Sequence, residues 1–176
     1  MPALRRALAF HREFSLIQTD LVCFSPLRWD SVFQRPRQLM SRAGRDRIVL
    51  FVEEPVISDG DAPLLLQRPV APGVTVVVPQ RPRNLSATLA AASHGAQLRM
   101  LMHCMELVNP GLWYYTPMMT GIGDHLDASY VVYDCMDDPS GFPGAPPDIK
   151  EREASLIGRA EVVFMGDRSL FRSKRH

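Results

Sequence analysis

The sequence predicts a doubly wound α/β domain, in which helices cover both faces of a parallel sheet. Short apolar runs alternate with segments of helical periodicity along the 176 residues, and this alternation is typical of parallel sheets. Polar residues follow the apolar runs directly, as where 130–133 leads into Asp134. Ligands of such sheets bind beyond the carboxyl ends of the strands. The same pattern therefore indicates a site for a polar ligand.

Each predicted strand is a short apolar run rich in β-branched or aromatic residues. The predicted strands are 21–24, 47–52, 74–78, 112–115, 130–133 and 162–165. Pro79 is expected to end the third of these. Residues 55–72 read as a loop because Ser-Asp-Gly-Asp lies at their centre, with a short edge strand at 64–66.

The predicted helices lie between the strands, at 34–43, 86–108, 118–126, 148–159 and 167–175. Pro36 fits the first turn of the first helix, where a missing N–H costs little, and Gly44 closes that helix. Ser86 caps the longest helix, whose apolar residues recur every three or four positions as far as Leu107. Residues 138–147, with four prolines, are expected to form a loop, and residues 1–19 an N-terminal arm.

Composition excludes several classes of protein. The net charge of +1 provides no field that would attract nucleic acid or an anionic membrane. The three cysteines have no C-x-x-C spacing, which argues against a disulfide framework or a structural zinc site and fits a reducing cytoplasm. No apolar run approaches the roughly 18 residues that a membrane span needs. The first 14 residues lack the features of a signal peptide.

Common catalytic motifs are missing from the sequence. It contains no P-loop, no H-E-x-x-H and no G-x-S-x-G. Gly121-Ile-Gly123 lacks the third glycine of a dinucleotide-binding loop. A receiver-like phospho-acceptor domain is also disfavoured, because Asp30 lies too far from the first strand and Lys174 too late after the last.

Three candidate binding residues, Arg28, Trp29 and Arg35, follow the first strand and open the first helix. A helix N-terminus attracts anions, and arginine strengthens that attraction. Contact with an anion or a sugar is one interpretation, and a salt-bridged surface turn is the other. Trp29 could stack on a sugar ring or simply fill the edge of the sheet.

Acidic residues follow two further strands. Asp134 and Asp137 come at the end of the 130–133 run, and Glu54 follows the 47–52 run. Clustered carboxylates can bind sugar hydroxyls or a metal, or raise one another's pKa for acid–base chemistry. Asp134 is the residue expected to face the crevice, whereas Asp137 could instead cap a turn.

A set of motifs, taken in order, resembles a known family. They are Asp20-Leu-Val-Cys-Phe-Ser25, Leu27-Arg-Trp-Asp30, Gln34-Arg-Pro36, Phe51-Val-Glu-Glu-Pro55, Leu112-Trp-Tyr-Tyr-Thr-Pro-Met118 and Val132-Tyr-Asp-Cys-Met-Asp137. Together they resemble the N-terminal, Rossmann-like half of bacterial family-4-like (GT-B) glycosyltransferases, close to those assigned to teichuronic acid biosynthesis. The resemblance covers residues 20–175.

The resemblance implies an acceptor-side domain at 20–176, with the C-terminal donor-binding domain absent from this chain. It implies a nucleotide-sugar co-substrate, no bound metal or cofactor, and a glycan or lipid-linked sugar as acceptor. The missing domain or a partner chain would complete the enzyme, which would be cytoplasmic, with peripheral association at the inner face of the membrane. Arg28, Trp29 and Arg35 would line the acceptor side; Glu54, Asp134 and Asp137 would hydrogen-bond sugar hydroxyls; Tyr115 and Thr116 would form the floor.

The chain also departs from the family pattern. Pro26 stands where the family commonly has a His that faces the cleft, and Arg37-Gln38 and Met165-Gly-Asp167 replace Gln-His and Thr-Gly-Gly. No catalytic residue is therefore assigned. The alternative interpretation is a non-catalytic α/β binding module, or a fragment that functions only with a partner.

Overall fold

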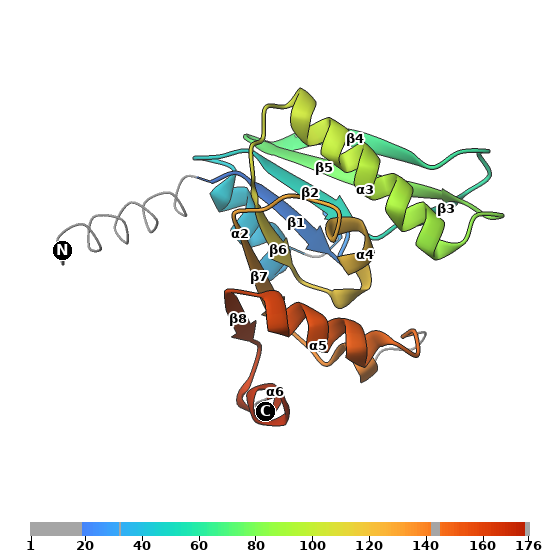
Figure 1. Ribbon diagram of the computed structural model, residues 1–176. Coiled ribbons are helices and arrows are strands. Elements are labelled where there is room, and N and C mark those ends of the chain that lie inside the picture. The colour runs from blue at the N-terminus through green and yellow to red at the C-terminus, as the bar shows by residue number, and fades with distance from the viewer. Residues whose placement is uncertain (1–18, 32, 142–144, 175–176) are drawn as a thin grey trace, which may run out of the picture.

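The sheet of the computed structural model has the strand order of a doubly wound domain (Figure 1). The structure describes residues 19–31, 33–141 and 145–174. Strands β5, β2, β1, β6, β7 and β8 are parallel neighbours in that order. Numbered along the chain, these six strands give the order 3-2-1-4-5-6, which defines the doubly wound fold. The predicted fold class is confirmed.

The elements alternate along the chain. The strands are β1 (Leu21–Ser25), β2 (Val49–Glu53), β3 (Val56–Ser58), β4 (Leu64–Ala71), β5 (Val74–Pro82), β6 (Gly111–Tyr114), β7 (Tyr130–Cys135) and β8 (Val162–Met165). The α-helices are α2 (Arg35–Ala43), α3 (Ala87–Cys104), α4 (Thr120–Gly123), α5 (Ile149–Arg159) and α6 (Arg168–Ser173). Short 3₁₀ turns are η1 (Pro117–Met119) and η2 (Pro139–Gly141).

Helices cover the two faces of the sheet and enclose two apolar cores. Successive side chains of a strand point to opposite faces, so β1 contributes Phe24 to one core and Cys23 to the other. Phe24 stacks on Tyr114 at 4.7 Å in the core that α3, α4 and α5 cover. Met40 of α2 packs into the second core with Cys23 and Phe51. Both faces of the central strands are thereby buried.

The predicted loop at 55–72 contains two strands. The edge strand expected at 64–66 is present as the start of β4, which continues to Ala71, whereas β3 was not expected. The short β3 pairs in parallel with the end of β5, and the eight-residue β4 pairs antiparallel with β5. Strand β4 carries Pro69 beside a register shift, which an edge strand tolerates because one side of its backbone needs no partner. Gly73 makes the β4–β5 turn with a φ of 66°, where a Cβ would lie 2.1 Å from the Gly44 carbonyl oxygen.

Strand β5 continues through Pro79, where the sequence predicted its end. Pairing with β2 stops at Val77 and pairing with β3 starts at Gln80, so Pro79 lies between the two ladders and its missing N–H breaks neither. The longest helix is shorter than predicted, because it ends at Cys104 and Glu106 has a left-handed φ of 58°. The Leu107 N–H then bonds back to the Met102 carbonyl at 2.9 Å.

Most of the other predicted elements lie within one or two residues of their predicted bounds. The predicted helix at 118–126 instead divides into η1 and the short α4. Strand β7 extends to Cys135, so that Asp134 lies inside the strand and not after it. The predicted arm, apart from Thr19, lies outside the described residues, as do part of the 138–147 loop and Arg175.

Candidate functional site

The carboxyl edge of the sheet gathers the segments that follow β1, β2 and β6. Strand β1 lies between β2 and β6, and the chain order reverses at β1 and β6. In open α/β sheets this reversal opens a crevice, and ligands bind there. The segment after β1 carries Arg28, the segment after β2 carries Glu54, and the segment after β6 carries Thr116.

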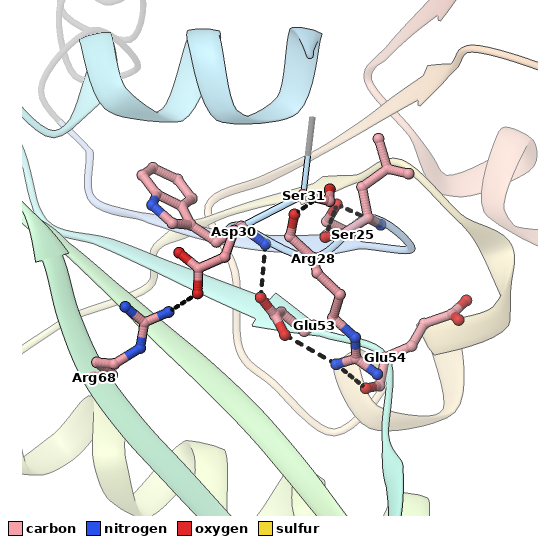
Figure 2. A network of polar contacts seen from close by, with 9 residues as sticks. Ser25, Arg28, Asp30, Ser31, Glu53, Glu54 and Arg68 are labelled. Atoms are coloured by element: carbon pink, nitrogen blue, oxygen red, sulfur yellow. Dashed lines mark hydrogen bonds and ion pairs between the residues drawn. The ribbon is translucent and has the colours of Figure 1, made fainter. Parts of the chain in front are cut away.

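Glu53 holds the segment that follows β1. Its Oε2 accepts a hydrogen bond from Arg28 Nη1 at 2.9 Å, and its Oε1 accepts from the Trp29 backbone N–H at 2.8 Å (Figure 2). Glu53 is buried, whereas the Arg28 side chain is 41% exposed. Charge-assisted bonds to a buried carboxylate are stronger than neutral ones. The guanidinium of Arg28 is therefore held in place while its side chain stays partly exposed.

Arg28 binds Glu54 as well as Glu53, but it does so through the backbone carbonyl of Glu54. Arg28 Nη1 also donates to the Glu54 carbonyl oxygen at 2.8 Å. The carboxylate of Glu54 points away from this bond (Figure 2). Burial raises the pKa of Glu54, and the positive charge of Arg28 opposes the rise. Arg28 and Glu54, predicted from separate strands, thus lie side by side.

Trp29 lies inside the protein. Its side chain is 3% exposed and meets Phe51 edge to face at 5.1 Å. The Arg37 guanidinium lies 5.4 Å from the centre of the Trp29 ring. These contacts favour the second interpretation of Trp29, as a residue that fills the edge of the sheet. Trp29 and Glu53 together fix the conformation that presents Arg28.

A second group of predicted residues lies on the α2 face of the sheet. Arg35 Nη2 is 3.2 Å from Asp134 Oδ1, with Arg35 44% exposed and Asp134 fully buried. Both oxygens of Asp134, the Tyr115 hydroxyl and the Trp113 indole nitrogen form no hydrogen bond of normal geometry among the described residues. Burial raises the pKa of Asp134, while Arg35 and the polar groups of Trp113 and Tyr115 oppose the rise.

The buried polar atoms around Asp134 form a group that lacks hydrogen-bond partners among the described residues. Buried polar groups are nearly always hydrogen-bonded, so unpaired ones indicate water, a ligand or a local rearrangement. Burial also raises the pKa of the Tyr115 hydroxyl and of the nearby Cys23 thiol, and both therefore remain protonated near neutral pH. Asp134 does not face an open crevice; Arg35 is the partly exposed member of the group.

The last two predicted residues have separate positions. The Thr116 hydroxyl oxygen accepts a hydrogen bond from the Met118 N–H at 3.2 Å and so caps η1. Asp137 is exposed, and its carbonyl oxygen accepts from the Cys135 thiol at 3.3 Å. The structure thus brings Arg28 close to Glu54, and Arg35 close to Asp134 and Tyr115, while no contact joins Asp137 to either group in the described part of the chain.

A pocket of about 780 Å³ opens beside Glu54, and we call it the α3 pocket. Its walls come from the segment after β2, the end of β5, the first turns of α3, η1 with α4, and α5. The segment after β2, the end of β5 and η1 with α4 lie at or just after the carboxyl ends of strands, and α3 and α5 follow β5 and β7. The pocket therefore belongs to the same edge as Arg28. Its volume lies within the range of small-molecule sites.

His94 forms part of the pocket wall and was not predicted as a site residue. It is fully buried; its Nε2 lies 2.9 Å from the Gln80 carbonyl oxygen, and its Nδ1 has no partner in the described residues. A carbonyl accepts only, so Nε2 carries the proton and Nδ1 is a free acceptor. Burial lowers the pKa of His94, and the bond to Gln80 opposes this.

Neither a metal centre nor a membrane span is evident in the part of the chain that the structure describes. No three His, Cys, Asp or Glu side chains of the described residues are grouped as metal ligands. No helix in the same residues combines the length and apolarity needed to cross a bilayer.

The parallel sheet flanked by helices matches a Rossmann-like half of the GT-B fold. An E. coli trehalose-6-phosphate synthase, solved with UDP-2-fluoro glucose bound, superposes with a TM-score of 0.52 at 9% sequence identity. The match covers 87% of this chain and 41% of that one, so the chain spans about two-fifths of the length of that structure. No family model and no curated protein matches the sequence. At this identity the likeness is one of fold.

Proposed function

We propose that this chain is the acceptor-side domain of a glycosyltransferase. It would bind a saccharide acceptor at the carboxyl edge of its sheet, while a nucleotide-sugar donor is held by residues outside this chain. The observation that carries the proposal is the position of Arg28 and Glu54. Both lie at the reversal of strand order in a domain whose fold resembles half of a sugar-transferring enzyme.

The site offers groups that can orient the acceptor hydroxyl in such a reaction. An acceptor hydroxyl attacks the anomeric carbon of the donor sugar, the bond to the nucleotide phosphate breaks, and the hydroxyl proton is lost. Orienting that hydroxyl accelerates the reaction strongly, because a bound, fixed geometry replaces a random encounter between the two reactants. The carboxylate of Glu54 and the guanidinium of Arg28 are an acceptor and a donor of hydrogen bonds with which to orient it.

The family resemblance in the sequence narrows the acceptor class. We propose a cell-surface glycan or its lipid-linked precursor, as in teichuronic acid biosynthesis, with the chain on the cytoplasmic side of the membrane. Arg35, Asp134 and Tyr115 would support the α2 side of the same edge, and Thr116 would fix the turn that follows β6. No bound cofactor or metal is part of the proposal.

The proposal is tested by saccharide binding to this chain. Saturation-transfer NMR with a panel of methyl glycosides should detect binding, and Arg28→Ala should weaken it. Arg83→Ala is the matched control, because Arg83 is 73% exposed and pairs with Asp59 through 2.8 Å on the surface. If no glycoside of the panel binds, or if both variants bind as the native chain does, the proposal is wrong.

A further inference from the structure

The α3 pocket has a chemistry that indicates which kind of saccharide it takes. Its volume of about 780 Å³ is large enough for a ring and its substituents. Glu54 lines it, so the pocket is continuous with the Arg28 group described above.

The charges of the pocket balance. Asp124 pairs with Arg159, and Arg152 pairs with Asp148 at 2.9 Å, so these two wall residues are neutralised by neighbours. One carboxylate, Glu54, and one guanidinium, Arg81, remain on the wall. Arg81 uses one N–H to bind the Leu85 carbonyl at 2.7 Å, which leaves others free. A pocket with one charge of each sign favours a neutral ligand over an anion.

The wall can accept hydrogen bonds as well as donate them. No hydrogen bond joins the Glu54 carboxylate to the other residues drawn in Figure 2, and His94 Nδ1 is an unpartnered acceptor of the same wall in the described residues. Acceptors of this kind need O–H or N–H groups from a ligand or from water. Sugar hydroxyls are both donors and acceptors, so they can pair with Glu54 and with Arg81 at once.

Much of the remaining wall is apolar, although Thr88, Thr120 and His125 also line it. Ala87, Ala90 and Ala91 come from successive turns of α3, and Met119 and Ile122 face them from η1 and α4. The axial C–H groups of a pyranose ring form an apolar face that can pack on such a wall. Ligand sites generally combine an apolar lining with a few polar groups that set orientation.

We propose that the α3 pocket takes an uncharged, hydroxyl-rich pyranose ring of the acceptor, oriented by Glu54 and Arg81. This rests on the proposed function, and it adds the location of the ring and the exclusion of a phosphorylated sugar. Glu54 is then a specificity residue, because its negative charge repels a phosphate while accepting hydrogen bonds from hydroxyls.

The test compares neutral and phosphorylated sugars on paired variants. The probes are methyl glycosides of glucose, galactose, mannose and N-acetylglucosamine, and the corresponding hexose 6-phosphates, titrated by NMR into the chain. Ala87→Trp should block the pocket mouth, and Glu54→Gln should weaken binding of a neutral glycoside about tenfold, because a charge-assisted hydrogen bond becomes a neutral one.

Two controls match these variants. Ala96→Trp places the same ring on an exposed position of α3 outside the pocket, and Glu151→Gln changes an exposed carboxylate of α5 outside the pocket. Both should bind the glycosides within about twofold of the native chain, as surface substitutions usually do. Thermal melts of all four variants show whether each is folded.

The outcomes separate this inference from the function on which it rests. Tighter binding of a 6-phosphate than of its neutral glycoside, or stronger phosphate binding by Glu54→Gln without loss of glycoside binding, overturns the inference. Glycoside binding that Ala87→Trp and Glu54→Gln leave unchanged also overturns it, while the proposed function stands. Absence of any sugar binding overturns both.

Discussion

Arg28 and Glu53 join the loop after β1 to the end of β2 through a contact of 2.9 Å between Nη1 and Oε2. The second oxygen of Glu53 accepts the Trp29 N–H, so one buried carboxylate fixes two successive residues of the loop. Since the loop presents Arg28 at the carboxyl edge, Glu53 positions the candidate site without needing to touch a ligand.

Glu53→Ala should lower the free energy of unfolding by about 1–3 kcal/mol, because it leaves the buried Trp29 N–H unpaired. Urea denaturation measures the effect. Asp59→Ala, which removes the exposed partner of Arg83, is the control and should cost less than about 0.5 kcal/mol. Equal effects of the two substitutions would show that Glu53 does not hold the loop.

Arg35 and Asp134 should show strong energetic coupling. Arg35→Met leaves a fully buried carboxylate without its ion partner, so it should destabilise the protein at neutral pH. The double variant Arg35→Met/Asp134→Asn removes the charge and should recover part of the loss, with a coupling energy of about 0.5–3 kcal/mol in a double-mutant cycle. Additive effects would contradict the contact.

His94 should make stability fall in mild acid. Burial holds the folded-state pKa of His94 below its usual value of 6.5, so as pH falls below 6.5 the unfolded chain binds a proton before the folded chain does. The stability that neutral His94 contributes is complete above pH 6.5 and is lost as the pH falls towards its folded-state pKa. His94→Gln, which keeps a donor for the Gln80 carbonyl, should flatten this slope in denaturation curves measured from about pH 7.5 to about pH 5.5.

The exposed His103 lies on the same helix and provides the control for His94. His103→Gln should leave the pH dependence of stability unchanged. A native slope that persists in His94→Gln would mean that another group titrates.

Substitution by alanine should change the stability of the protein in opposite directions at two glycines. Gly73→Ala places a Cβ 2.1 Å from the Gly44 carbonyl oxygen at a positive φ, and should destabilise the protein by more than about 1 kcal/mol. Gly158 lies in α5, where an added Cβ would meet nothing within 4 Å beyond its chain neighbours and the adjacent helix backbone, so Gly158→Ala should stabilise by about 0.5–1 kcal/mol. Melting temperatures of both variants give the signs directly.

The fold could be predicted from the sequence because its central strands are buried on both faces. Such strands are uninterrupted apolar runs, and β1, β2, β6 and β7 were all recognised as such. Strand β4 was predicted only as a short edge strand at 64–66, because it is exposed for most of its length and contains Pro69. Its pairing with β5 depends on a tertiary neighbour that a local pattern does not contain.

The site was predictable only in part. The polar residues after the strands identified Arg28 and Glu54, which the parallel sheet brings together. The sequence did not distinguish Glu53 from Glu54, although strand alternation places their side chains differently and gives the buried role to Glu53. It also could not reveal His94, whose role depends on the packing of α3 against β5.

Mapping where a saccharide binds on the sheet tests the proposed acceptor site most directly. Backbone amide shifts of labelled chain should be recorded during titration with the methyl glycoside that binds best. The perturbed amides should follow the carboxyl ends of β1, β2 and β6, at 27–31, 54–57 and 115–121. Perturbations confined to the opposite edge, at residues 19–20, 48, 111 and 129–130, would contradict the proposed site.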